Sequence, residues 1–380
     1  MKIAIIIDSM NKAGGIERVI SLMANYWVNN NYSVCLLTHS DKACFSFYPL
    51  DKRVKNIYIG ALPKHTIIDY MPGMYPFRVI RKRIFQYKKV IKKEEPDIIL
   101  SMMHGTENYY LSLFSCGIPI IGVNHITLDL RKGLFDRNIL KKLFKQFVFK
   151  LQVHEFRKWQ AIVALSKTDN EKLISLRCRS KYIPNPRTFD VSRESYSAFS
   201  RGKVIIMVGR FDYLKGQDRL IDVWRGLAPL YPEWKLHLVG DGPYLKKVNE
   251  KIESYNLSKQ VIVTSTVKDI ASLYKQSSIF ALTSRTESFG MVILEAMANG
   301  LPCVVFDCEN GPRDIIVDDE NGYLVPDGNI KMFGEKLQKL INNKSLCEKF
   351  VDNSFKTLNC YSVSVIMKKW DELFESILRN

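Results

Sequence analysis

Short apolar runs alternate with helix-like stretches along the whole chain. Each run is rich in Ile, Val and Leu and is bounded by polar residues, which is typical of strands buried on both faces of a parallel sheet. In the first half the predicted strands are residues 2–7, 33–38, 97–102, 119–123 and 161–165. In the second half they are residues 203–208, 235–239, 261–264, 278–283 and 302–306. The pattern predicts repeated βαβ units and therefore an α/β fold.

The chain is long enough, at 380 residues, for two domains of ordinary size. Two prolines in Ile183-Pro184-Asn185-Pro186 interrupt the pattern and are followed by a polar stretch to Gly202. We therefore expect one domain over residues 1–185 and a second over residues 186–360. A final amphipathic helix is expected over 361–380. Its apolar positions are Val365, Trp370, Leu373, Phe374 and Ile377.

Several classes of protein are disfavoured by composition. No apolar run approaches the roughly 18 residues needed to span a bilayer. The N-terminal run resembles a secretory segment only briefly, because Asp8 interrupts it and no cleavage site follows, so it is interpreted as a first buried strand. The eight cysteines are scattered without C-x-x-C or zinc spacing, which indicates a reduced cytoplasm.

Positive charge is concentrated in the first half of the chain. Residues 1–200 hold 32 Lys and Arg against 16 Asp and Glu, a net +16, whereas residues 201–380 hold 24 against 23, a net +1. A one-sided basic field indicates an anionic partner. The candidates are a membrane surface, a phosphorylated acceptor and nucleic acid.

Two basic amphipathic stretches carry much of this charge. Arg78 to Lys93 holds eight basic residues beside an apolar stripe of Ile80, Ile84, Tyr87 and Ile91. Leu140 to Lys158 mixes lysines with a second stripe. The lysines are Lys141, Lys142, Lys145 and Lys150. The apolar stripe consists of Leu140, Phe144, Phe147 and Leu151. We expect both apolar stripes to lie in the core. The basic faces are either ordinary solvated surfaces or contact sites for an anionic membrane or for the diphosphate of a lipid-linked acceptor.

Two carboxylates stand eight positions apart, at Glu287 and Glu295, around the start of a predicted helix. Ligands in open α/β sheets bind beyond the carboxyl ends of strands, and a helix N-terminus there offers N–H groups to a phosphate. Glu287 is expected to face the ligand from the loop. Glu295, about two turns into the helix, could accept hydrogen bonds from a sugar. This layout suits a sugar nucleotide.

Further candidate positions follow other strands. Arg210 and Lys215 lie at the end of strand 203–208, where two cations can clamp a diphosphate and stabilise its charge as it leaves; ordinary surface cations are the alternative. Val267 follows strand 261–264. Gly14 and Gly15 follow the first strand, without the G-x-G-x-x-G spacing that a nicotinamide cofactor would require.

Taken together, these segments resemble a known family. The pattern E-x-F-G-x-x-x-x-E-A-M-A-x-G-x-P from Glu287 to Pro302 resembles the signature of glycosyltransferase family 4, whose members are retaining enzymes of the GT-B fold. Similar family segments are G-R-x4-K-G from Gly209, G-x-G-P from Gly240 and G-G-x-E-R from Gly14. The resemblance implies two Rossmann-like domains facing a central cleft, with the C-terminal helix crossing back onto the N-terminal domain. Many positions resemble the family over residues 203–326, and few do so over residues 20–180.

The resemblance also implies roles for individual residues. Catalytic roles fall to Glu287 and His125, near the donor sugar, and to Arg210 and Lys215, at the diphosphate. His104 is a weaker candidate. The resemblance implies donor contacts for Glu295 at the ribose, for the amides of Gly290, Met291 and Val292 at the phosphate, for Val267 at the base and for Gly15 near the diphosphate.

The expected activity is retaining transfer of a hexose or N-acetylhexosamine from a nucleotide sugar, with UDP as the expected nucleotide. The segment Asp307 to Asp314 resembles enzymes that build surface polysaccharide on polyprenyl diphosphate, so the expected acceptor is a lipid-linked saccharide at the cytoplasmic membrane face. No D-x-D cluster is present, and we predict neither an essential metal nor a cofactor besides the nucleotide-sugar co-substrate.

Three alternatives remain open. The first is a glycosyltransferase with a soluble acceptor. The second is a GT-B epimerase, which Arg210, Lys215 and Glu287 disfavour because they fit the transferase pattern. The third is a basic protein that binds nucleic acid or membranes without transferase activity. Nucleic acid is not the expected partner, because the basic stretches lack interleaved aromatic residues on which bases could stack.

Overall fold

The computed structural model describes residues 1–39, 46–60, 74–103, 105–133, 138–191 and 201–379. The chain forms two compact units, one of Met1–Pro184 with Met367–Asn380 and one of Asn185–Ile366. The division falls between Pro184 and Asn185, where proline restricts the backbone and interrupts regular structure.

The first unit is built on a seven-stranded sheet in the order β3-β2-β1-β4-β5-β6-β7, in which each pair of neighbours is parallel. The strands are β1 (Lys2–Ile7), β2 (Ser33–Thr38), β3 (Lys55–Tyr58), β4 (Ile98–Ser101), β5 (Ile120–Asn124), β6 (Ala161–Ala164) and β7 (Ser180–Tyr182). The five central strands are almost wholly buried because helices cover both faces of the sheet.

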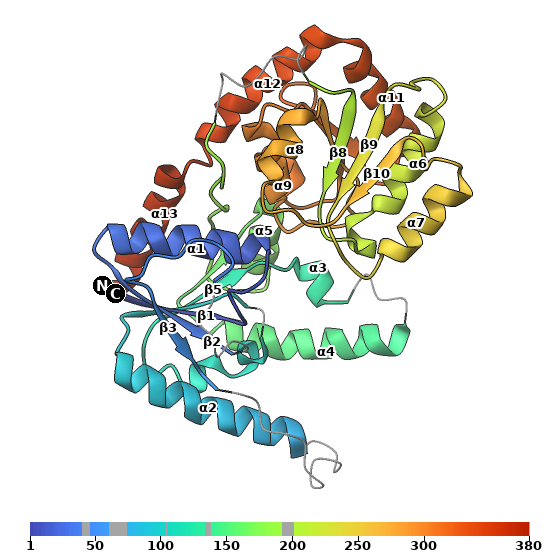
Figure 1. The fold of residues 1–380 in the computed structure, drawn as a ribbon. Coiled ribbons are helices and arrows are strands. Elements are labelled where there is room, and N and C mark those ends of the chain that lie inside the picture. Colours follow the sequence, from blue (N-terminus) through green and yellow to red (C-terminus); the bar gives the residue numbers. More distant parts are fainter. Residues whose placement is uncertain (40–45, 61–73, 104, 134–137, 192–200, 380) are drawn as a thin grey trace. The chain divides into compact units, whose positions relative to one another are not determined.

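The helices of this unit are α1 (Gly15–Asn29), α2 (Met74–Glu94), α3 (Leu128–Arg131), α4 (Ile139–Phe156) and α5 (Lys167–Ser175), with short 3-10 turns at Thr106–Tyr109 and Leu111–Leu113. Figure 1 shows α1 and α2 on opposite sides of the β1–β3 part of the sheet. Most of the last helix, α13 (Val363–Leu378), also belongs to this unit. Trp370 and Phe374 of α13 pack their rings against Trp27 of α1, with centroids 6.0 and 5.5 Å away.

The second unit is built on a six-stranded parallel sheet in the order β10-β9-β8-β11-β12-β13. Its strands are β8 (Val204–Val208), β9 (Lys235–Val239), β10 (Val261–Thr264), β11 (Ile279–Leu282), β12 (Cys303–Asp307) and β13 (Tyr323–Pro326). Its helices are α6 (Gln217–Leu227), α7 (Leu245–Ser254), α8 (Ile270–Gln276), α9 (Met291–Ala298), α10 (Pro312–Ile315), α11 (Ile330–Asn342) and α12 (Lys344–Asn359). Figure 1 places α6 and α7 on one side of β8–β10 and α8 and α9 on the other.

All ten predicted strands are confirmed to within a residue at each end. Three further strands, β3, β7 and β13, were not predicted. Each lies at the edge of its sheet, where only one neighbour is needed and the apolar pattern is weak, as in Ser180-Lys181-Tyr182.

The two predicted apolar stripes differ in burial: the stripe on α2 is in or against the core, and the stripe on α4 is exposed. On α2, Tyr87 and Ile91 are buried in the core and Ile80 and Ile84 pack partly buried against it, as expected. On α4 the prediction is wrong, because the four stripe residues are all more than half exposed; they are Leu140, Phe144, Phe147 and Leu151. A different face of α4, with Phe149, Val153 and Phe156, enters the core instead. Among the described residues, no helix is both long and apolar enough to cross a membrane.

Candidate active site

The sheet of the second unit has its topological switch point between β8 and β11, because the chain runs outward from β8 through β9 to β10 and returns to the other side of β8 with β11. Ligands of doubly wound sheets bind at this point, beyond the carboxyl ends of the strands. Arg210 and Lys215 follow β8, and Glu287 follows β11. The fold therefore delivers these three predicted residues to the two strand ends that flank the switch point.

Lys215 and Glu287 form a direct ion pair there. The Lys215 ammonium nitrogen lies 2.7 Å from each carboxylate oxygen of Glu287. Ser284 Oγ donates a third hydrogen bond, of 2.7 Å, to Glu287 Oε1. The Glu287 side chain is almost wholly buried, whereas Lys215 keeps about a third of its side-chain surface exposed. A buried carboxylate thus holds a lysine whose charge still reaches solvent, and Arg210 adds a second exposed cation at the end of the same strand.

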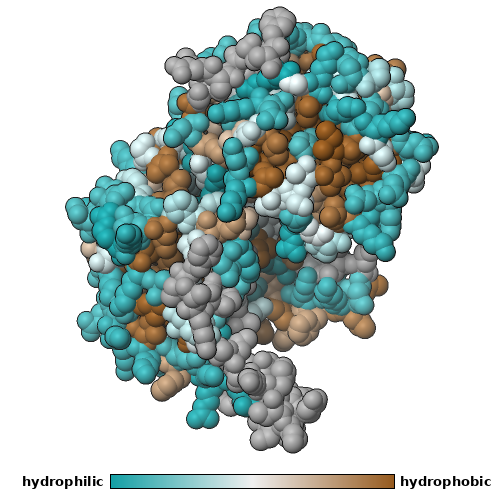
Figure 2. Space-filling view, in the orientation of Figure 1, coloured by the Kyte–Doolittle hydropathy of each residue, from teal (hydrophilic) through white to brown (hydrophobic). Residues whose placement is uncertain are grey.

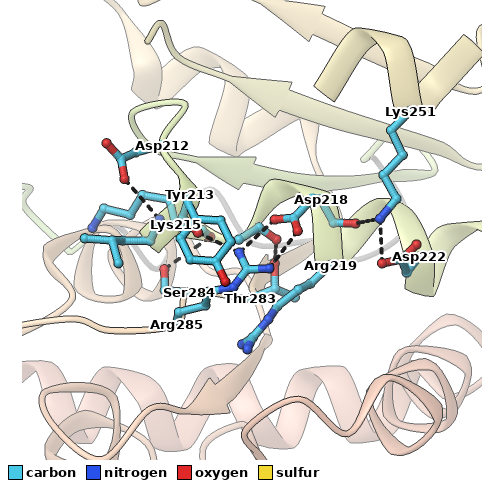
Figure 3. Close-up of polar contacts among 12 residues, drawn as sticks. Asp212, Tyr213, Lys215, Asp218, Arg219, Asp222, Lys251, Thr283, Ser284 and Arg285 are labelled. Atoms are coloured by element: carbon cyan, nitrogen blue, oxygen red, sulfur yellow. Dashed lines mark hydrogen bonds and ion pairs between the residues drawn. The ribbon is translucent and has the colours of Figure 1, made fainter. Parts of the chain in front are cut away.

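The loop that carries Lys215 is fastened to the segment after β11 by several hydrogen bonds (Figure 3). Thr283 Oγ1 donates to the carbonyl of Gly216 at 2.8 Å, and the Arg285 amide donates to the carbonyl of Leu214 at 2.7 Å. Arg285 also forms two bonds to Asp218, at 2.8 and 2.6 Å, and lies over the Tyr213 ring at 3.9 Å from its centroid. These contacts fix the distance between the Lys215 loop and the Glu287 loop.

The Asp218–Arg285 contact is stabilised in its ionised form. Burial by itself would raise the pKa of Asp218, but the hydrogen bonds and positive charge of Arg285 lower it below its ordinary value. The Asp218–Arg285 pair therefore stays ionised at neutral pH. Beside Glu287, burial raises the pKa of the Cys308 thiol to about 12, so that this cysteine is a neutral packing group.

Glycines let the neighbouring turns approach closely. Gly240 has φ +145°, and a Cβ on it would overlap the carbonyl oxygen of Gly209. Gly242 lies in the same way against Phe211, whose amide donates to the Asp241 carbonyl at 2.9 Å. The turns after β8 and β9 are consequently in van der Waals contact, which side chains would prevent.

Val267 lies in the turn that follows β10, the strand next to β9. It is half-buried in the loop between β10 and α8. Asp241 Oδ2 accepts a 2.7 Å hydrogen bond from the amide of Thr266, which also lowers the pKa of Asp241. A continuous row of turns thus runs along the strand ends from β10 through β9 and β8 to β11, and it contains the predicted positions 210, 215, 267 and 287.

Glu295 is buried on α9 and is held by two hydroxyl groups. Tyr274 Oη donates to Glu295 Oε2 at 3.2 Å, and Thr188 Oγ1 donates to Glu295 Oε1 at 3.4 Å. Because α9 begins at Met291, Glu295 lies about one turn into the helix rather than the two turns expected. Neither hydroxyl was singled out from the sequence, since Tyr274 reads as a helix residue and Thr188 as part of the interdomain segment.

Gly290 caps α9 in the left-handed region, with φ +96° and ψ +49°. The first amides of an α-helix have no partner within the helix. Met291 and Val292, the first two residues of α9, are both half-buried. A phosphate could be held by these amides, as the resemblance implies.

The remaining predicted residues lie in the first unit. His125 is buried and directly follows β5, and Gly15 is exposed at the first position of α1. His104 lies outside the described residues. Next to His125, the guanidinium of Arg131 donates to Asn124 Oδ1 at 3.0 Å and to the Met103 carbonyl at 2.8 Å. Nothing in the sequence pattern had pointed to this half-buried arginine.

No group of three or more His, Cys, Asp or Glu side chains suited to a metal ion occurs in the described part of the chain.

Family models match nearly the whole chain. Residues 13–190 match the model described as "Glycosyltransferase Family 4", and residues 188–357 match the model described as "Glycosyl transferases group 1". The chain belongs to glycosyltransferase family 4. The family predicted from the segment at Glu287 is thereby confirmed, and the protein is a glycosyltransferase.

Relatives of this glycosyltransferase align along its full length. The amylovoran biosynthesis glycosyltransferase AmsD of Erwinia amylovora is 28% identical over 382 residues, covering 98% of this chain and 99% of the relative. A Campylobacter jejuni α-1,4-N-acetyl-D-galactosaminyltransferase, named for an acceptor with two GalNAc residues and diNAcBac on undecaprenyl diphosphate, is 22% identical over 380 residues, covering 99% of both chains.

Solved structures show the same fold. TarM of Staphylococcus aureus, in a complex that contains UDP, superposes with a TM-score of 0.77 at 16% identity, covering 98% of this chain and 99% of TarM. HepE of Anabaena in complex with UDP superposes with a TM-score of 0.76 at 19% identity, covering 99% and 100%. The predicted GT-B fold is confirmed.

Proposed function

We propose that this glycosyltransferase moves a sugar from a UDP-sugar to a hydroxyl of a saccharide linked to polyprenyl diphosphate, at the cytoplasmic face of the membrane. The product would serve the assembly of a surface polysaccharide or glycan. The observation that carries the donor half of this proposal is the Lys215–Glu287 ion pair beside Arg210 at the switch point.

The chemistry follows from the charges at that point. When the bond between the sugar and the diphosphate breaks, negative charge grows on the leaving phosphate. Fixed cations placed beforehand lower the barrier, since they need not reorganise during the reaction. Lys215 is held in place by Glu287, and its exposed third can meet the diphosphate. Arg210 would supply the second charge from the same strand end, and the amides of Gly290, Met291 and Val292 would hold a phosphate oxygen.

Glu287 suits a positioning role better than a nucleophilic one. Both its oxygens already accept bonds from Lys215, and one also accepts from Ser284. A carboxylate committed in this way is a weak nucleophile, although its remaining lone pairs can accept bonds from donor hydroxyls. We propose retention by attack from the face of the leaving group, with the departing phosphate taking the acceptor proton. Glu295 would bind the ribose, Val267 the base and His125 the donor sugar, with Gly15 near the diphosphate.

The acceptor half of the proposal is supported by the printed activities of relatives. The Campylobacter jejuni relative is named for an undecaprenyl-diphosphate-linked acceptor, and the Erwinia amylovora relative for the biosynthesis of amylovoran. The UDP of the HepE and TarM complexes supports the choice of nucleotide. Belonging to this family favours a transferase over the epimerase and over a binding protein without enzymatic activity.

The test is transfer by the purified enzyme. UDP-, GDP- and ADP-sugars are first compared for thermal stabilisation, because a ligand that binds the native state raises its melting temperature. The donor that stabilises is then offered with a polyprenyl-diphosphate-linked saccharide or with the same saccharide free in solution. We expect UDP-sugar stabilisation and preferred transfer to the lipid-linked acceptor, with the anomeric configuration kept in the product by NMR. Equal transfer to the free saccharide would establish the soluble-acceptor alternative.

The absence of an essential metal is tested in the same assay. We propose that protein cations alone neutralise the diphosphate, so turnover should survive EDTA after dialysis against a chelating resin. Loss of turnover on chelation, with recovery on adding Mg²⁺ or Mn²⁺, would show that the donor binds with a metal ion.

A further inference from the structure

Helix α4 has two apolar faces on opposite sides. Its inner face, with Phe149, Val153 and Phe156, packs into the core of the first unit. Its outer face consists of six large apolar residues that are each more than half exposed: Ile139, Leu140, Leu143, Phe144, Phe147 and Leu151. At about 100° per residue these six fall within an arc of roughly 140°, centred almost opposite the inner face.

This outer face is unusual for a surface. Single exposed apolar residues are normal, but a contiguous stripe indicates a binding surface. In the described part of the chain sixteen large hydrophobic side chains are markedly exposed, and six of them are these residues of one helix. Figure 2 shows brown and tan side chains along the outer edge of α4, which Figure 1 labels.

The exposed charge on α4 is positive. Lys150 is exposed near one edge of the apolar stripe and Lys141 is exposed beyond the other edge, and Lys142 and Lys145 are half-buried. The helix has one acidic residue, Glu155, which is buried and paired with Lys158 at 3.0 Å. An apolar stripe bordered by lysines is typical of helices that lie in the interface of an anionic membrane.

We propose that the outer face of α4 inserts into the headgroup region of an anionic membrane, with the helix lying parallel to the membrane plane. The stripe from Ile139 to Leu151 is about 18 Å long at 1.5 Å per residue, and such helices bury their apolar face roughly 5–10 Å deep. Each lysine near the surface strengthens partitioning roughly fivefold. The enzyme is thereby held at the membrane independently of any bound sugar.

A second copy of the chain fits this face less well. A two-fold dimer through α4 would bring the outer face of one copy against the same face of the other. The lysines near each stripe would then approach one another, and like charges across an interface are unfavourable. An anionic lipid surface accepts both the apolar stripe and its lysines.

The test compares sedimentation of the purified chain with vesicles of phosphatidylglycerol and phosphatidylcholine in equal parts and with vesicles of phosphatidylcholine alone. We expect binding to the anionic vesicles that weakens as salt is added. The triple variant Leu143→Ser/Phe144→Ser/Phe147→Ser should bind at least about tenfold more weakly. The matched control is Ile174→Ser/Leu230→Ser/Val317→Ser, which removes three exposed apolar residues outside both basic helices and should bind like the wild type.

Charge is tested separately. Lys141→Gln/Lys150→Gln should weaken binding to anionic vesicles roughly 25-fold, while Lys246→Gln/Lys339→Gln on the second unit should not. A Phe147→Trp probe should be quenched by brominated lipids, which reports insertion directly. All of these side chains are exposed, so folding is checked by circular dichroism and melting temperature without lipid.

Three results would overturn the inference. The first is vesicle binding by the triple variant that equals that of the wild type, and the second is an equal loss of vesicle binding in the apolar control. The third is a wild-type dimer in analytical ultracentrifugation that becomes a monomer in the triple variant, with vesicle binding the same in both proteins. The last would assign the face to a second copy. Donor stabilisation in lipid-free buffer should be the same in all variants, so a failure of the proposed sugar transfer is distinguishable from a failure of membrane binding.

Discussion

The ammonium nitrogen of Lys215 lies 2.7 Å from both carboxylate oxygens of Glu287, a residue 72 positions away in the chain. Because Glu287 is almost wholly buried, removing Lys215 leaves a buried carboxylate without its cation. Removing Glu287 frees the lysine to adopt other rotamers. The two side chains are therefore expected to act as one unit, which has measurable kinetic consequences.

We expect Glu287→Gln and Lys215→Met each to lower kcat about 10²–10³-fold, because each removes or misplaces charge needed as the diphosphate leaves. The double variant should be no more than about tenfold slower than the worse single variant, since residues that act together are not additive. The measurement is kcat and KM for the donor. Losses that simply multiply would show that the two side chains contribute independently.

A neighbouring ion pair provides the control. Lys251 lies 2.6 Å from Asp222 in the same unit, between α7 and α6, away from the strand ends (Figure 3). Lys251→Met removes the same kind of side chain from a more exposed pair, in which the lysine contacts one oxygen of Asp222 and the backbone carbonyl of Asp218. It should leave kcat and KM near their wild-type values.

The hydroxyl of Tyr274 is predicted to position Glu295 for the nucleotide. Tyr274→Phe removes the 3.2 Å hydrogen bond to Glu295 Oε2 while keeping the ring. A hydrogen bond to a charged group contributes about 1.5 kcal/mol or more, so the Kd for UDP should rise about tenfold with kcat nearly unchanged. Titration calorimetry measures this effect.

Tyr255→Phe is the matched control, because Tyr255 donates a similar bond, of 3.1 Å, to Asp222 on α6. It should leave the Kd for UDP unchanged. If Tyr274→Phe bound UDP as tightly as the wild type, Glu295 would not be the nucleotide contact that we propose.

Gly216 is predicted to be irreplaceable in the Lys215 loop. It has φ +70°, and a Cβ there would overlap the carbonyl oxygen of Thr283. Gly216→Ala should therefore cost about 1–2 kcal/mol in backbone strain alone and displace Lys215 as well. We expect a melting temperature lower by several degrees together with a large loss of kcat.

Gly226→Ala makes the same substitution ten residues later. Gly226 lies within α6, and a Cβ there would meet no atom within 4 Å. Because alanine favours a helix over glycine by about 1 kcal/mol, this variant should be slightly more stable and equally active. Similar melting temperatures for the two variants would contradict the role assigned to Gly216.

His39 is predicted to make the stability of the first unit depend on pH. Burial, assisted by the charge of Arg83, lowers the pKa of His39 to about 4 from its ordinary 6.5. Between these two pH values the unfolded chain binds a proton that the folded chain does not, so the free energy of unfolding rises with pH across this window. A shift of this size corresponds to about 3 kcal/mol.

Asp169 has the opposite effect on the free energy of unfolding. Burial raises its pKa to about 6, so its stabilising contribution is greatest at low pH and is lost as the pH rises from about 4 to 6. The prediction is therefore a difference between variants. His39→Gln should lack the gain between pH 4 and 6.5, so the advantage of the wild type should grow across that window in urea unfolding. Parallel pH profiles for the two proteins would rule out this role for His39.

Much of the architecture could be predicted from the sequence because buried parallel strands leave a strong local signal. All ten predicted strands formed, and the first unit runs to Pro184, one residue from the boundary predicted between residues 185 and 186. The segments containing Arg210, Lys215 and Glu287 were found by their motifs. The edge strands β3, β7 and β13 were missed because a strand with one neighbour needs few apolar residues.

The partners of those residues, and the outer face of α4, were decided only by the tertiary structure. Periodicity shows that α4 has apolar residues on more than one side, but it does not tell which side meets the core. That depends on where the sheet lies: Phe149 packs in the core, whereas Phe144 is exposed. Likewise, the bonds of Glu287 to Lys215 and Ser284 exist because β8 and β11 are neighbours across the switch point. Local patterns encode which elements form, whereas contacts between distant segments depend on how those elements pack.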